Sequence, residues 1–152
     1  MSFKRFLAID FGEIRIGLAI GDSENLIASP LETILNKSSE ISCNKITELA
    51  IEWEINQIII GMPKIYADQE INKQIKNFGA NLKKKCNLDV IFFDEDYSSN
   101  YAKSELSKQM QAGRKKKVNK EEIDRIAAAI ILQSYFENEI FKRADTGTSS
   151  KN

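Results

Sequence analysis

The sequence predicts an α/β fold: a mixed sheet, antiparallel at first and parallel later, flanked by helices. Two observations support this prediction. Three apolar, β-branched runs follow one another at the N-terminus with only short turns between them, as in an antiparallel β-meander. After them, segments of helical periodicity alternate with short apolar runs, the pattern of β-α-β units with parallel strands. With 152 residues, the chain has the size of one such domain.

The predicted meander comprises residues 4–11, 14–22 and 26–34. Gly12 and Glu13 separate the first two runs, which favours a tight hairpin. Pro30 lies in the third run and has no backbone N–H to donate. We therefore expect the third strand at an edge of the sheet.

Helices and parallel strands are expected to alternate through the rest of the chain. The predicted strands are residues 57–63 and 89–93, and the predicted helices are residues 39–54, 68–85, 98–110 and 120–138. A basic linker, residues 113–119, joins the last two helices, and the sequence is polar from Lys142 onward. We expect one domain, residues 1–141, followed by a disordered tail, residues 142–152.

The composition excludes several classes of protein. The 22 Lys and Arg balance the 22 Asp and Glu, so no global charge attracts the chain to nucleic acid or membrane. The absence of His excludes Ser-His-Asp and Cys-His catalysis and His-ligated metals. Two distant cysteines indicate neither a zinc site nor a disulfide framework, and no apolar run is long enough to cross a membrane. We expect a cytoplasmic protein.

Three acidic residues lie where carboxylates are unexpected. Asp10 ends a strand that is apolar on both faces, a costly environment for a charge. Glu95 follows strand 89–93 at its carboxyl end, where α/β sheets place their ligands. Asp124 lies in the first turn of the last helix and falls on that helix's apolar face. Each has a structural alternative: a hairpin cap, a solvated loop acid, and a partner of the helix dipole, respectively.

Together the three acids predict a metal site. If they meet at one edge of the sheet, three carboxylates stay ionised only when cations lie between them. Because the set contains only oxygen ligands, it favours Mg²⁺ or Mn²⁺.

The same residues carry a family resemblance. Four segments resemble, in the same order, motifs of the YqgF (RuvX) family of RNase-H-like nucleases: AIDFGEIRIGLAIGD (8–22), IIIGMP (58–63), DED (94–96) and EIDRIAAAIILQSYF (122–136). The resemblance implies a ribonuclease-H-like sheet with Asp10, Glu95 and Asp124 as metal-binding catalytic acids. It also implies processing of the 5′ end of precursor 16S ribosomal RNA, and the family has been proposed to resolve four-way DNA junctions.

Two positions depart from the family's motifs. The family usually has Arg where this chain has Asp96, and an Asn- and Gly-rich continuation where this chain has Lys64, Ile65 and Tyr66. An additional acid beside Glu95 increases the repulsion within the anionic cluster. We expect it either to weaken substrate binding or to tighten metal binding while lowering activity.

A basic segment lies between the second and third predicted acids. From Tyr97 to Lys120 there are seven cations and one acid, a local charge of +6. We expect Arg15 and the cluster Arg114, Lys115, Lys116 and Lys117 to bind the phosphate backbone of a nucleic acid. The alternative is a solvated loop.

The sequence therefore favours a metal-dependent phosphodiesterase that acts on structured RNA. In a two-metal scheme Asp10 bridges two ions, Glu95 and Asp124 each hold one, and the products carry 5′-phosphates. One alternative is a Holliday junction resolvase acting on branched DNA, which would need two active sites and hence a homodimer. Another is a ribosome-assembly factor that binds RNA without cleaving it.

Overall fold

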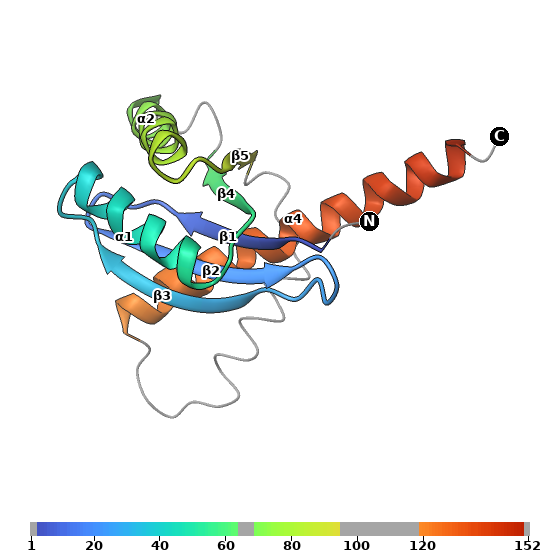
Figure 1. Ribbon diagram of the computed structural model, residues 1–152, viewed down its shortest axis with the longest axis horizontal. Helices are drawn as coiled ribbons and strands as arrows, with labels where there is room; N and C mark the ends of the chain where they lie inside the picture. The colour runs from blue at the N-terminus through green and yellow to red at the C-terminus, as the bar shows by residue number, and fades with distance from the viewer. Residues whose placement is uncertain (1–2, 64–68, 95–118, 151–152) are drawn as a thin grey trace.

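The computed structural model describes residues 3–63, 69–94 and 119–150. Five strands and three helices lie within these ranges (Figure 1): β1 (Arg5–Asp10), β2 (Arg15–Asp22), β3 (Ser29–Leu35), α1 (Ser39–Glu52), β4 (Gln57–Met62), α2 (Gln69–Cys86), β5 (Asp89–Asp94) and α4 (Lys120–Ser150). The predicted helix 98–110 lies outside the described residues, as does the basic linker except for Asn119. The other elements begin and end within a few residues of their predicted bounds, apart from the end of α4.

The five strands form one sheet in the order β3-β2-β1-β4-β5. β1 pairs antiparallel with β2, and β2 with β3, whereas β4 runs parallel to β1 and β5 parallel to β4. This topology confirms the predicted meander followed by parallel strands. β3 is an edge strand, as Pro30 predicted, and its pairing with β2 shifts register between Leu18 and Ala19.

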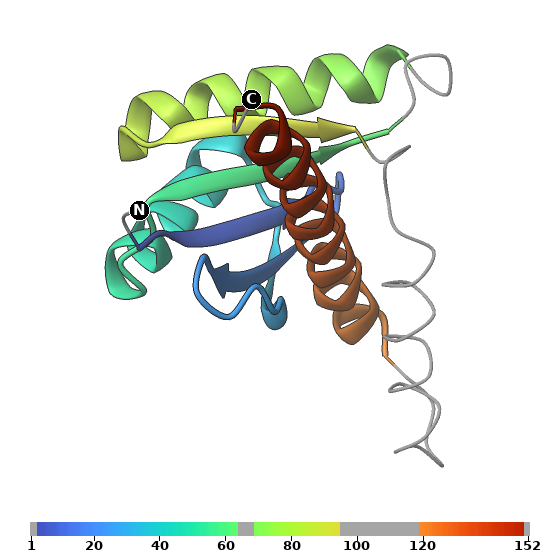
Figure 2. The same cartoon turned by 90° about the vertical axis from the view of Figure 1, so that its right-hand side faces the viewer.

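Helices cover both faces of the sheet (Figure 2): α4 crosses one face, and α1 and α2 pack on the other. Strands β1 and β2 present different side chains to the two faces. On the α1–α2 face the buried residues of these strands are Leu7, Ile9, Ile16 and Leu18. On the α4 face they are Phe6, Ala8 and Ala19, and both glycines of β2 lie against α4. Apart from Phe6, these two strands thus present small residues to α4, which allows the helix to approach the sheet closely at Gly17.

Helix α4 is longer than predicted. Its backbone is helical to Ser150, whereas the sequence predicts an end near Asn138 and a frayed tail from Lys142. No Pro lies between Lys120 and Ser150, and Gly147 is the only Gly in that stretch, so no strong helix breaker stops the helix earlier. The boundary of the domain at residue 141 stays a prediction.

Two exclusions made from the sequence concern membranes and disulfides. No helix among the described residues is long and apolar enough to span a bilayer. Cys43 and Cys86 are both free thiols, so they form no disulfide with each other.

Candidate active site

Asp10 ends β1 at the edge where the parallel strands have their carboxyl ends. Its partner in the antiparallel ladder is Gly17 of β2. Directly opposed residues of an antiparallel pair project to the same face, and Phe6 and Ala8, which alternate with Asp10 along β1, pack in the cluster under α4. The carboxylate of Asp10 therefore belongs to the α4 face.

Gly17 is the point at which α4 meets the sheet. A Cβ atom built on Gly17 would collide with the backbone carbonyl of Asp124 and with the backbone nitrogen of Arg125. Only glycine permits this approach, because any side chain would push the helix backbone away. Asp10 and Asp124 therefore both neighbour Gly17 through their backbones, so two of the three predicted acids lie at the same end of the α4 face.

Arg15 joins this site through an ion pair. Its Nε donates to Oδ2 of Asp124 at 2.6 Å, and the two side chains are 28% and 22% exposed. A hydrogen bond between charged groups that are this far buried is stronger than an ordinary surface pair. The sequence predicts Arg15 as a phosphate contact, but the pairing with Asp124 was not predicted.

The first turn of α4 is held in place by an N-cap and by the edge strand. Asn119 caps the helix: its side chain accepts a hydrogen bond from the backbone N–H of Glu122 at 2.8 Å. Thr33 of β3, the ladder partner of Gly17, donates to the carbonyl of Glu121 at 2.5 Å. Neither contact was predicted, although Asn119 followed by Glu122 has the spacing of a capping box.

Glu95, the third predicted acid, lies outside the described residues. Strand β5 continues to Asp94, so Glu95 is the next residue after the strand. Ile9 of β1 pairs with Ile60 of β4, which pairs with Phe92 of β5. The carboxyl end of β5 is therefore on the same edge of the sheet as Asp10, with β4 between them. The predicted phosphate contacts Arg114–Lys117 also lie outside the described residues.

The donor set of this site suits a hard divalent cation. Asp10 and Asp124 supply carboxylate oxygens, which Mg²⁺ and Mn²⁺ prefer. Among the described residues, no group of three Cys, Asp or Glu side chains is close enough to hold a metal ion. A third ligand would have to come from Glu95 or from elsewhere outside those residues.

Two relatives align with most of the chain. One from Nitrosospira multiformis, named "Putative pre-16S rRNA nuclease", is 38% identical over 134 residues, which are 86% of each chain. One of the same name from Fusobacterium nucleatum is 37% identical over 139 residues, 88% of this chain and 97% of the relative.

Two solved structures share the fold. Thermus thermophilus RuvC in complex with a Holliday junction substrate aligns with a TM-score of 0.63 at 14% identity, covering 90% of this chain and 96% of the other. The fowlpox virus Holliday junction resolvase aligns with a TM-score of 0.57 at 17% identity, covering 88% and 99%. At such identities the likeness concerns the fold alone, and it confirms the ribonuclease-H-like sheet.

A family model covers the segments that contain Asp10, Glu95 and Asp124. The model, described as "RuvX: Holliday junction resolvase", matches residues 4–138. This match and the relatives above show that the chain belongs to the RuvX family.

Proposed function

We propose that this protein is a divalent-metal-dependent nuclease that cleaves precursor 16S ribosomal RNA in the cytoplasm, with Asp10, Glu95 and Asp124 as its metal ligands. The observation that carries the proposal is that Asp10 and Asp124, far apart in the sequence, both have their backbones beside Gly17. Arg15 balances the charge of Asp124 in the structure, but a second acid at the adjacent strand end is costly to bury unless a cation offsets its charge. The names of the relatives support the choice of substrate.

The residues of the site have distinct roles in this proposal. Mg²⁺ or Mn²⁺, as two ions, would supply Lewis acidity at the scissile phosphate and activate the attacking water. Asp10, Glu95 and Asp124 would hold these ions through their carboxylate oxygens. In-line attack by water breaks the bond to the 3′ oxygen of the preceding nucleotide, which leaves a 3′-hydroxyl and a 5′-phosphate.

Arg15 and the basic segment would hold the RNA. In the structure the guanidinium of Arg15 neutralises Asp124. When a cation takes over that carboxylate, Arg15 has donors available for a phosphate oxygen beside the reacting bond. Arg114, Lys115, Lys116 and Lys117 would bind the backbone further along the strand.

Cleavage of precursor 16S RNA by the Asp10→Asn variant tests this function. We expect the variant to lose cleavage with Mg²⁺ or Mn²⁺ and to keep its fold, because Asn has nearly the shape of Asp and removes a charge from a partly buried position. The matched control is Asp89→Asn, since Asp89 is exposed at the opposite end of β5. Wild-type activity in Asp10→Asn, or undiminished activity in excess EDTA, would refute the proposal.

A second candidate is cleavage of four-way DNA junctions, which the description of the family model favours. Such an enzyme cuts two strands and would act as a homodimer. The same assay with a four-way junction, together with the mass of the protein in solution, distinguishes the candidates. Symmetric junction cleavage by a dimer, with precursor RNA left intact, would favour the resolvase.

A third candidate is a ribosome-assembly factor that binds RNA without cleaving it, for which the acidic Asp96 is the reason. Metal-independent RNA binding by wild type and Asp10→Asn alike, with no cleavage by either, would favour this function.

A further inference from the structure

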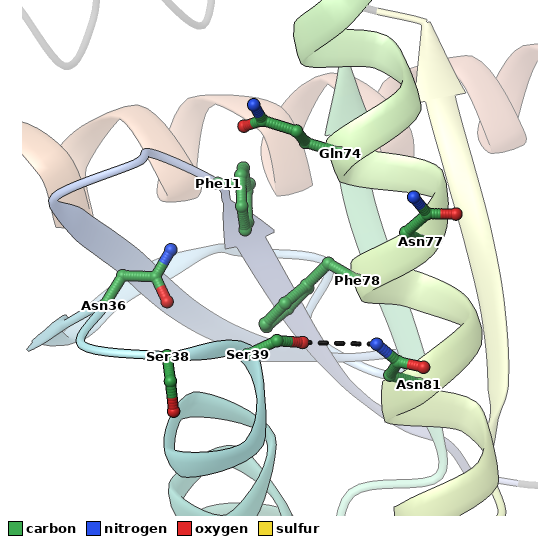
Figure 3. Close-up of a pocket in the computed structure, with 8 residues that line it drawn as sticks. All are labelled: Phe11, Asn36, Ser38, Ser39, Gln74, Asn77, Phe78 and Asn81. Carbon is green, nitrogen blue, oxygen red and sulfur yellow. Dashed lines mark hydrogen bonds between the residues drawn. The ribbon is translucent and has the colours of Figure 1, made fainter.

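A pocket of about 290 Å³ lies beside the candidate active site, on the face of the sheet opposite α4. Figure 3 shows its walls: the segment before α1 and the start of α1, the side of α2, and Phe11 at the end of β1. Six of its lining residues are Phe11, Asn36, Ser39, Gln74, Phe78 and Asn81.

The pocket combines an aromatic wall with uncharged polar groups. The rings of Phe11 and Phe78 lie 5.0 Å apart, centroid to centroid, at an angle of 50°. The rest of the lining is amide and hydroxyl side chains, with no charged residue among the lining residues. In the view of Figure 3 the Gln74 side chain points toward Phe11, and both residues line the pocket, so it offers an amide as well as an aromatic ring.

Hydrogen bonds fix part of this lining before any ligand binds. The Nδ2 of Asn36 donates to the carbonyl of Gly12 at 2.9 Å, and its Oδ1 accepts from the hydroxyl of Ser42 at 2.7 Å. Asn81 donates to the hydroxyl of Ser39 at 3.3 Å. Polar groups held in this way lose little conformational freedom on binding, which favours affinity.

This chemistry suits a nucleobase and not a phosphate. A base has a flat face that stacks on an aromatic ring and an edge with both donors and acceptors, which amide groups match. The lining has no cationic side chain to pair with a phosphate, and at the N-terminus of α1 the Ser38 side chain already accepts from the backbone N–H of Ile41. We propose that the pocket binds one unpaired nucleobase of the RNA substrate, an inference that rests on the proposed nuclease function.

The position of the pocket relative to Asp10 explains why the base must be unpaired. Phe11 follows Asp10 directly, yet it packs with the core under α1 and α2, whereas Asp10 belongs to the α4 face. An RNA strand with its scissile phosphate at Asp10 would have to pass over the end of β1 to place a neighbouring base in the pocket. A stacked, paired base cannot make this movement without leaving its helix.

Binding of the four free nucleosides, which carry no phosphate, tests the pocket without any cleavage. Titration of isotope-labelled wild type should shift the NMR signals of the Gln74 side-chain amide and the Phe11 ring. Gln74→Ala should weaken binding by about two- to tenfold, the effect of one lost hydrogen bond. Asn44→Ala is the control, because Asn44 is an exposed amide on α1 outside the pocket.

A cleavage assay then connects the pocket to the nuclease. An RNA with one abasic nucleotide near the cleavage point should show a higher KM with wild type, and Gln74→Ala should lose most of this discrimination. Absence of nucleoside shifts at Phe11 and Gln74 would overturn the pocket inference even if the RNA is cleaved. Nucleoside binding without cleavage of any RNA would refute the nuclease function and leave the base-binding pocket standing.

Discussion

The two faces of the sheet are packed in different ways, and the candidate site lies on only one of them. Toward α1 and α2, strands β1 and β2 present Leu and Ile side chains. Toward α4 they present Ala and Gly along most of their length, and the helix backbone reaches the strand at Gly17. The distance between packed elements depends on the side chains between them. The small residues allow α4 to approach the sheet closely enough to place Asp124 beside β2. The larger Leu and Ile side chains hold α1 and α2 at a greater distance.

Gly17→Ala is expected to have the largest effect, because it removes the close approach on the α4 face. The new methyl group would overlap the backbone carbonyl of Asp124, so α4 must move. We expect the free energy of unfolding to fall by about 3 kcal/mol, as in severe overpacking. Cleavage of precursor RNA should be lost at temperatures where the variant is still folded. Urea denaturation and the RNA assay measure the two effects.

The matched control for Gly17→Ala is Gly79→Ala on α2. A methyl group there would meet the ring of Phe92, which is 40% exposed and free to shift, and not a backbone. Replacing Gly inside a helix also gains helix propensity. If both variants lost activity equally, the close contact at Gly17 would not be what positions Asp124.

Arg15→Met should have the second largest effect. It breaks the ion pair with Asp124, which we compare with the exposed pair of Arg5 and Glu54 at the opposite end of the sheet. Without the guanidinium, Asp124 is left partly buried and unneutralised, so the metal-free protein should lose about 2 kcal/mol of stability. Mg²⁺ should then raise the melting temperature of the variant more than that of wild type. Melting curves in EDTA and in Mg²⁺ measure both changes.

The control for Arg15→Met is Glu54→Gln, which breaks the pair between Arg5 and Glu54. That pair spans 3.9 Å, and its side chains are 40% and 82% exposed. Its loss should change stability by about 0.5 kcal/mol at most. Equal destabilisation by the two variants would show that the Arg15 pair is an ordinary surface contact.

Ile58→Val tests the α1–α2 face of the sheet. A substitution there should lower stability without changing the activity of the site on the other face. Ile58 is fully buried under α1 and α2, and removing one methylene group should cost about 1 kcal/mol. Cleavage should be unchanged. Its neighbour Ile59 packs on the α4 face, so Ile59→Val gives the matched measurement. Loss of activity in Ile58→Val alone would mean that the site depends on the α1–α2 face.

The sequence predicted elements better than contacts, and particular residues show why. The alternating apolar residues of β1 and β2 and the Pro30 edge signal are local, so the meander could be predicted from them. The inward position of Asp124 follows from helical periodicity. Its pairing with Arg15 joins residues 109 positions apart and depends on how α4 docks, which no local pattern encodes. The pocket is a space left between α1, α2 and the end of β1, so it too requires the assembled fold.

The smallest predicted effect concerns Asp22, which lies at the end of β2 away from Arg15. Its carboxylate has a structural role. The backbone N–H groups of Asn25 and Glu24 donate to Oδ1 of Asp22 at 2.8 and 3.0 Å, which closes the turn after β2. The hydrogen bond from the Asn25 backbone, with smaller contributions from the Asn25 side chain, Glu24 and Arg5, lowers the pKa of Asp22 below its ordinary value. The folded state therefore favours the ionised carboxylate.

Asp22→Asn should accordingly change the dependence of stability on pH. A carboxyl group whose pKa is lowered by folding stabilises the protein above its unfolded pKa, and this contribution is lost as the pH falls through the folded pKa. Since the Asn amide oxygen still accepts hydrogen bonds, we expect wild type to exceed the variant by about 0.5 kcal/mol near pH 7. The difference should shrink well below pH 4, where Asp22 is protonated in both states. Urea denaturation at both pH values measures it, and an equal difference at both would show that the turn does not depend on the charge.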